Sequence, residues 1–270
     1  MTPQKTINNS ITNTTKKLSV QFALNGLSFL SHDGKEASLF KQKNLDQKGT
    51  PEELLHLLQQ SLEENNIELS SLDEVEIHYA SVLYTLVPKS LFDEKRSSDY
   101  LKFNSKILAT DFIAHDTINT LDLVVVYVPF ININNYFFEA VGSFSYFHHI
   151  SKLLEQSAYV FKNENEDAIL INVREAQFDL VIYKEHKLQI CNSYTFKTSE
   201  DFLYYILFTF EQLKIKPEDA RVQIIGHKFK DSSLYLLTEK YIGNIILLDG
   251  NFKELTESEV YHPTQIVLSN

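Results

Sequence analysis

Two segments of the chain match each other position by position: TSEDFLYYI at residues 198–206 and TPEELLHLL at residues 50–58. At this offset of 148 residues, Thr faces Thr, Glu faces Glu, an acid faces an acid, and every apolar position of the earlier segment meets an apolar one. Each segment begins as helices begin, with Thr as N-cap, acids in the first turn, and Asp or Glu three positions on. The match predicts an internal duplication in which both copies contain this helix.

Strand-like runs surround the two predicted helices in the same order. Three runs precede each helix and one follows it: residues 18–24, 27–31, 37–40 and 75–80 in the first copy, and residues 168–173, 177–183, 188–196 and 221–225 in the second. We therefore expect a polar tail at residues 1–17, a first half at residues 18–161 and a second half at residues 168–270. In the first half we also expect a buried strand at residues 122–130 and a helix at residues 135–156.

The composition narrows the class of protein. The chain has 270 residues, of which 43% are hydrophobic and 23% charged, so it can bury a substantial core. Its 25 Lys and Arg against 36 Asp and Glu give a net charge of −11, which repels phosphate backbones and anionic lipid heads. No apolar run approaches the roughly 20 residues that span a bilayer, and the single cysteine cannot form an internal disulfide. We expect a cytoplasmic protein that neither binds nucleic acid nor inserts into membranes.

Five short segments carry a resemblance to a known family. They are LSVQ at residues 18–21, NGLSF at 25–29, LVP at 86–88, NSYTF at 192–196 and, most distinctively, EDFLYYILF at 200–208. Over nearly all of residues 18–250 the chain resembles an uncharacterised bacterial family of domains of unknown function with an actin-like ATPase fold. The resemblance implies an α/β fold with mixed (α+β) sheets, built as two tandem ribonuclease-H-like halves. It implies no activity, because that family has none assigned.

Actin-like ATPases hold phosphates with two hairpin turns, each usually Asp-x-Gly followed by small or hydroxyl residues, which implies where a nucleotide cleft would lie here. The first turn keeps Gly26 and Ser28 but has Asn25 in place of the carboxylate that organises a divalent ion. The second turn begins at Asn172 and contains no glycine, and Gly226 stands alone where a nucleoside-binding glycine pair is expected. These five residues are candidate remnants of a cleft. For Asn25 and Gly26 an ordinary hairpin turn is the favoured explanation.

Other candidate sites have less support. Two-metal nuclease chemistry needs carboxylates on the first strand, where the copies offer Gln21 and Asn172. His148 and His149 would point about 100° apart on a helix and cannot chelate one ion together, so we expect each to lie on the surface or to cap a helix. Cys191 lies in an apolar strand pattern, which favours a packed core thiol over a nucleophile. We predict neither a catalytic residue nor a metal site.

Three functions remain open at this point. The first is a degenerate, non-catalytic actin-like module without a cofactor, which acts as an interaction or scaffold protein by binding another protein. The second is an ATPase or phosphotransferase that binds ATP with Mg through divergent loops, and the third is a binder of another small ligand in the old cleft. The count of only seven glycines and the missing Asp residues favour the first. The aromatic segments at residues 135–150 and 201–213 are each a candidate core helix or partner surface.

Overall fold

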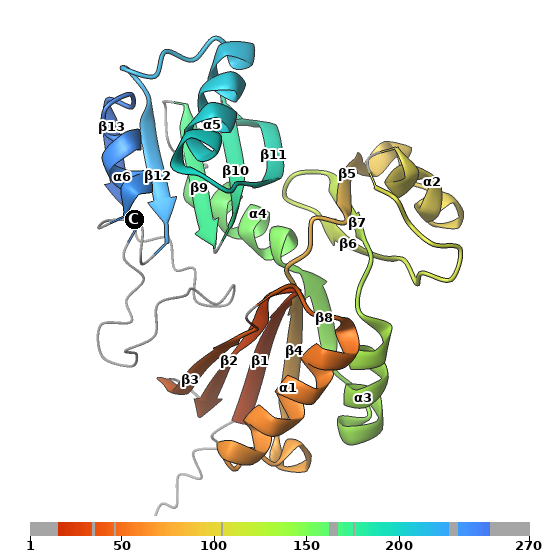
Figure 1. Cartoon of the computed structure of the whole chain (residues 1–270). Helices are drawn as coiled ribbons and strands as arrows, with labels where there is room; N and C mark the ends of the chain where they lie inside the picture. The colour runs from red at the N-terminus through yellow and green to blue at the C-terminus, as the bar shows by residue number, and fades with distance from the viewer. Residues whose placement is uncertain are drawn as a thin grey trace, which may run out of the picture.

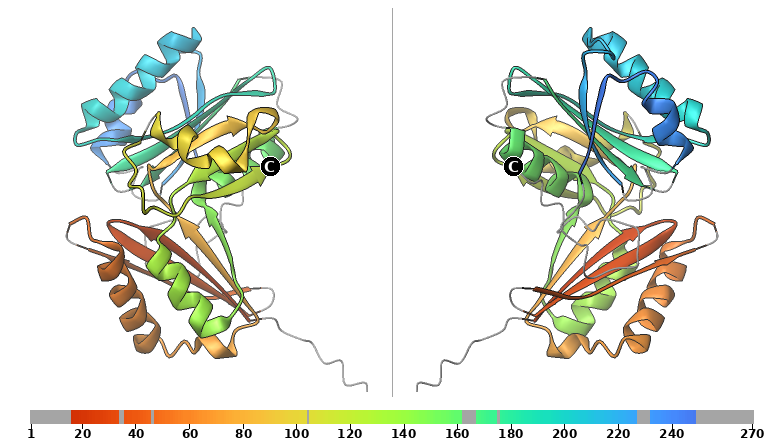
Figure 2. Two further views of the ribbon diagram at one scale, coloured as in Figure 1. Left: turned by 90° about the vertical axis from the view of Figure 1, so that its right-hand side faces the viewer. Right: turned by 90° about the vertical axis from the view of Figure 1, so that its left-hand side faces the viewer.

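The computed structural model describes residues 16–33, 36–45, 47–103, 105–161, 167–174, 176–226 and 232–248. It contains two five-stranded mixed sheets, each covered by helices, and a separate three-stranded sheet (Figure 1). The first sheet lies at the bottom and the second at the top of both views in Figure 2. Most of the expected tail at residues 1–17, up to residue 15, and residues 249–270 of the second half lie outside the described residues.

The helices and strands follow one another in an order that repeats. The first half contains β1 (Lys16–Ala23), β2 (Gly26–Asp33), β3 (Glu36–Asn44), α1 (Pro51–Glu64), β4 (Glu74–Tyr79), β5 (Tyr84–Pro88), α2 (Ser97–Lys102), β6 (Ala114–Ile118), β7 (Leu123–Tyr127), α3 (Ile131–Val141), β8 (Ser145–His148) and α4 (His149–Val160). The second contains β9 (Ala168–Arg174), β10 (Gln177–Lys184), β11 (Lys187–Thr195), α5 (Ser199–Leu213), β12 (Arg221–Ile225), α6 (Ser233–Thr238) and β13 (Asn244–Leu247).

The two large sheets have the same topology, which confirms the predicted duplication. The strand orders are β3-β2-β1-β4-β8 and β11-β10-β9-β12-β13. In each sheet the first three strands form an antiparallel meander, and the first strand also pairs in parallel with the strand that follows the helix. This is the ribonuclease-H-like arrangement that the resemblance implied for each half.

The helices α1 and α5 are equivalent in detail. Thr50 and Thr198 are their N-caps, and both make complete capping boxes with the acid three positions on. The residues that face the core are fully or almost fully buried and recur at the offset of 148: Leu54, Leu58 and Leu62 in α1, and Phe202, Ile206 and Phe210 in α5. An equivalent backbone hydrogen bond follows the end of each helix. In it the amide of Ile67 or Ile215 donates to the carbonyl oxygen five residues earlier.

Residues 135–156 do not form the single helix that the sequence predicted. Helix α3 ends at Val141, strand β8 adds to the edge of the first sheet beside β4, and α4 begins directly after it. The break occurs because Gly142 takes a φ of 76°, the left-handed region in which glycine commonly ends helices. The aromatic residues that follow favour an extended strand.

Helix α4 belongs to the first half in sequence but packs against the second sheet. Its residues Ile150, Leu153 and Leu154 share a buried apolar cluster with Leu170 and Val181 of that sheet. Helix α5 covers the opposite face of the second sheet. There it contacts the strand residues that alternate with those facing α4. The hydrophobic core therefore runs from one half into the other through α4.

The three-stranded sheet, in the order β5-β7-β6, is inserted between β4 and α3 and was not expected from the sequence. With α2 it forms a small core around Leu101, Val124 and Val126. The predicted strand at residues 122–130 is present as β7. None of the described helices is both long enough and apolar enough to cross a bilayer.

Candidate functional site

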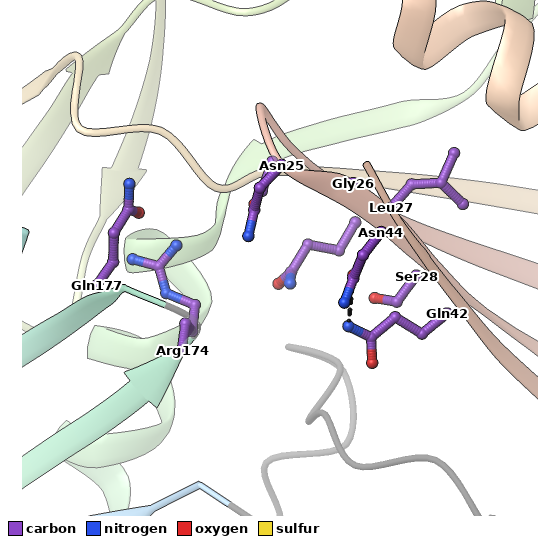
Figure 3. Close-up of a pocket in the computed structure, with 10 residues that line it drawn as sticks. Asn25, Gly26, Leu27, Ser28, Gln42, Asn44, Arg174 and Gln177 are labelled. Carbon is purple, nitrogen blue, oxygen red and sulfur yellow. Dashed lines mark hydrogen bonds between the residues drawn. The ribbon is translucent and has the colours of Figure 1, made fainter. Parts of the chain in front are cut away.

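The β1–β2 hairpin of the first half faces the β9–β10 hairpin of the second half across a small cavity (Figure 3). The cavity has a volume of about 50 Å³. The first half lines it with Gln21, Ala23, Asn25, Gly26, Leu27, Ser28, Gln42 and Asn44, and the second half lines it with Arg174 and Gln177. These are the two turns that would cradle phosphates if the chain kept the nucleotide cleft of its fold.

The first hairpin has a structural reason for its glycine. Ala23 pairs with Gly26, so Leu24 and Asn25 form a two-residue turn. Gly26 has a φ of 154°, and a Cβ there would lie 2.8 Å from Cα of Asn44 and collide with the carbonyl oxygen of Lys43. Close packing against β3 therefore explains the glycine without a ligand.

Among the described residues, the cavity wall carries several polar side chains but no carboxylate. Amides dominate it, with one hydroxyl from Ser28 and one guanidinium from Arg174. Oγ of Ser28 and Nε of Arg174 are both buried and have no hydrogen-bond partner among the described residues. A hydrated Mg²⁺ prefers carboxylate partners, and these wall residues supply none.

Arg174 is held from behind by a buried carboxylate. Asp179 on β10 is completely buried, and its Oδ1 accepts from Nη2 of Arg174 at 2.8 Å and from Oγ of Ser193 at 2.5 Å. Its Oδ2 accepts from Nδ2 of Asn172 at 2.9 Å and faces Nε2 of His149 at 3.0 Å. Four side chains, from strands β9 and β11 and helix α4, thus converge on one carboxylate of β10.

The charges of this cluster balance. Burial raises the pKa of Asp179, but the nearby Arg174 and His149 together lower it by more. The carboxyl therefore stays ionised, with a pKa well below its usual range. Burial is the largest influence on the pKa of His149 and lowers it, and the carboxylate of Asp179 offsets only part of that shift. A neutral imidazole leaves the Arg174–Asp179 ion pair electrically balanced in the interior.

The structure brings together some of the predicted site residues and separates others. Asn25, Gly26 and Ser28 line the cavity. Asn172 does not line it, because its amide is bound to Asp179. Gly226 follows β12 and packs against Val173, where an added Cβ would lie 3.0 Å from the Val173 Cβ.

Asp179, Arg174 and His149 were not singled out as a site from the sequence. One signal was available for Asp179, since it is the only charge inside the apolar run from Phe178 to Tyr183. The expectation of a surface position for His148 and His149 was wrong, because both are buried. The cap alternative holds for His148, whose Nδ1 accepts from the amide of Ile150.

Two further kinds of site, a reactive cysteine and a metal site, were considered from residue types. Cys191 is buried, as expected, and burial raises the pKa of its thiol, so the unreactive protonated form is favoured. Within the described ranges, no group of three His, Cys, Asp or Glu side chains is placed to hold a metal ion.

The fold and the sequence can now be compared with known proteins. A protein from Bacteroides thetaiotaomicron with an actin-like ATPase fold and unknown function is 18% identical, with a TM-score of 0.77 over 87% of this chain and 91% of that one. The PilM-PilN type IV pilus biogenesis complex contains a chain that is 10% identical, with a TM-score of 0.58 over 87% of this chain and 89% of that one. Both similarities show that the chain has the actin-like ATPase fold. The sequence has no significant match among curated proteins. A family profile matches residues 4–245, and the chain therefore belongs to the family described as "Protein of unknown function (DUF3822)".

Proposed function

We propose that this protein is a non-catalytic member of the actin-like fold that works by binding another protein, and that no nucleotide occupies the space between its halves. The observation that carries the proposal is the cavity between the two hairpins. Its volume is about 50 Å³, whereas pockets for small-molecule ligands span roughly 300–1,000 Å³. None of the described residues in its wall supplies a carboxylate to organise a metal ion, and phosphoryl transfer depends on a positioned metal and on preorganised donors.

The contact between the halves also opposes a nucleotide. Helix α4 is joined to the second sheet by the His149–Asp179 contact and by a shared apolar core. These buried contacts stabilise the arrangement of the halves in which the cavity is small. PilM, which shares the fold at low identity, occurs in a complex with PilN, so a protein partner is compatible with this architecture.

Two measurements on the full chain test this function. Phosphate release from Mg-ATP should stay at the uncatalysed rate. Protein purified natively from its own cells should carry a stoichiometric protein partner, and chelation of Mg²⁺ should not release that partner. Steady ATP turnover, or a complex that nucleotide assembles or dissolves, would favour the ATPase alternative instead.

A second candidate function, a small polar ligand in the cavity, has one specific observation in its favour. Oγ of Ser28 and Nε of Arg174 come from different halves, line the same cavity, and lack partners among the described residues. Such unpaired buried groups are costly unless something satisfies them. Inorganic phosphate at millimolar concentration should raise the melting temperature if the site is real, and Ser28→Ala should reduce that rise.

A further inference from the structure

Helix α3 is apolar on two sides, and only one of them is covered. Ile133 and Phe137 are fully buried and belong to the main core. Ile131 and Phe138, seven residues apart, lie together on another side of the helix and are 49% and 66% exposed. A helix that keeps large apolar side chains in water on one side has a face suited to a partner.

The exposed side of α3 borders one cavity, and a second cavity lies beside it; together we call them the α3–β6 groove. The first cavity, of about 370 Å³, is lined by Ile131, Asn135 and Phe138 among others. The second, of about 400 Å³, runs along β6 and the start of α4. Phe112 and Tyr146 line both cavities, so the two lie side by side. Each is large enough for side chains of a peptide.

The two ends of the groove differ in charge. No charged residue of the described part of the chain lines the α3 cavity, whereas Glu94, Asp116 and Glu155 all line the β6 cavity. Of the residues that the structure describes, no Lys or Arg lines either cavity, and His115 is the one basic residue in the wall. Lys152 lies nearby, over the ring of Phe147, but Glu76 pairs with it at 3.5 Å.

Asp116 is fixed in the wall rather than free to turn away. Its Oδ1 accepts from the hydroxyl of Tyr127 at 3.0 Å. Its Oδ2 accepts from the amide of His148 at 2.8 Å and from the hydroxyl of Ser151 at 2.5 Å. This carboxylate therefore contributes a preorganised acidic surface at the β6 end.

We propose that the α3–β6 groove binds a peptide segment of a partner protein in which large apolar side chains stand next to Lys or Arg. The apolar side chains would cover Ile131 and Phe138, and the cation would enter the acidic end, where Tyr146 offers an aromatic ring. The inference rests on the proposed protein-binding function and names its surface. Charge complementarity selects this occupant, since a second copy of a chain with net charge −11 would bring more acid to an acidic groove.

Selection from a display library of random twelve-residue peptides, with the full chain as bait, tests the proposal. The enriched peptides should combine at least two large apolar residues with neighbouring Lys or Arg. The best peptide, made with a fluorophore, should lose at least tenfold in affinity for Phe138→Ala and for Glu155→Lys. Both positions are exposed, so melting temperatures should match the parent. Affinity should also fall with added salt.

Matched control variants lie on the other half. Phe208→Ala and Glu211→Lys change an exposed aromatic and an exposed acid of α5, and both should leave the affinity unchanged. Enrichment of acidic peptides, an absence of any enriched motif, or groove variants that bind like the parent would each overturn the groove assignment. Peptides whose binding depends on α5 instead would overturn the groove but not the protein-binding function, which ATP turnover tests separately.

Discussion

Nε2 of His149 lies 3.0 Å from Oδ2 of Asp179, and the two side chains join helix α4 to strand β10. The residues are 30 positions apart and both are buried. Because α4 continues from the last strand of the first sheet, this contact ties the two halves together at the place where an actin-like cleft would open. The carboxylate that makes it also fixes Arg174 beside the cavity.

Removing the Asp179 carboxylate should destabilise the fold strongly. Asp179→Ala leaves Arg174, whose side chain is only 12% exposed, without its counter-charge, and the loss of one partner of a buried pair costs about 3–5 kcal/mol. Urea unfolding at pH 7 measures the change in the free energy of unfolding. Asp219→Ala is the control, because its pair with Lys216 is exposed and should contribute under about 1 kcal/mol. Equal effects of the two variants would show that the buried cluster is not a stabilising link.

Asp116 should make the protein less stable as the pH rises from about 4 to about 6. Burial raises the pKa of this carboxyl to about 6, although hydrogen bonds from Ser151, His148 and Tyr127 oppose the shift. The folded state therefore holds this proton more tightly than the unfolded state, where the pKa is about 3.9. The folded state loses that advantage over this range, an effect of up to about 3 kcal/mol.

The variant Asp116→Asn isolates this effect from all other titrations. Its free energy of unfolding, minus that of the parent, should rise by up to about 3 kcal/mol between pH 4 and pH 7. Urea unfolding at several pH values measures the difference. Stability curves that run parallel for both proteins would contradict an elevated pKa at this position.

The aromatic face of α5 is predicted to carry much of the second core. Phe202 and Phe210 are fully buried against the second sheet, so replacement of either by Ala should cost about 3–5 kcal/mol. Phe208 on the same helix is 48% exposed, and Phe208→Ala should cost far less. Thermal and urea unfolding of the three variants would contradict this packing if their stabilities were alike.

Gly26 should tolerate no side chain. A Cβ there would collide with the carbonyl of Lys43, and backbone cannot move aside as a side chain can. Gly26→Val should lower the melting temperature markedly or abolish folding. Gly49→Ala is the control, because the nearest atom to its new Cβ is the end of the flexible Leu45 side chain. If Gly26→Val melts like the parent, the glycine must be present for another reason, such as a ligand.

Local signals explain why the duplicated unit could be predicted. A few neighbouring residues are enough to recognise the capping boxes at Thr50 and Thr198 and the apolar positions that follow them. The strands of each meander are also neighbours in the chain. The break between α3 and β8 was missed because the aromatic run is compatible with a helix or a strand until Gly142 and the edge of the sheet decide between them.

The buried charge cluster could not be predicted in the same way. A charged residue within a strand can face solvent or core, and Asp179 acquires meaning only when His149, Arg174 and Ser193 reach it from separate elements. The resemblance implied that the second turn would face the turn of Asn25, Gly26 and Ser28, but it named Asn172 as the site residue, whereas Arg174 and Gln177 of that turn line the cavity. Contacts of this kind are set by tertiary packing rather than by local pattern.

A melting curve in the presence of millimolar Mg-ATP tests the central claim most directly. A ligand at about 100 times its dissociation constant stabilises a fold by roughly 2.7 kcal/mol, which for a chain of this size is a shift of roughly 5–10 °C. We predict no shift relative to the same concentration of Mg²⁺ with an unrelated anion. A clear rise that Gln177→Glu reduces, by setting a carboxylate against the phosphates at the cavity wall, would show that the space between the halves is a nucleotide site and would contradict the account.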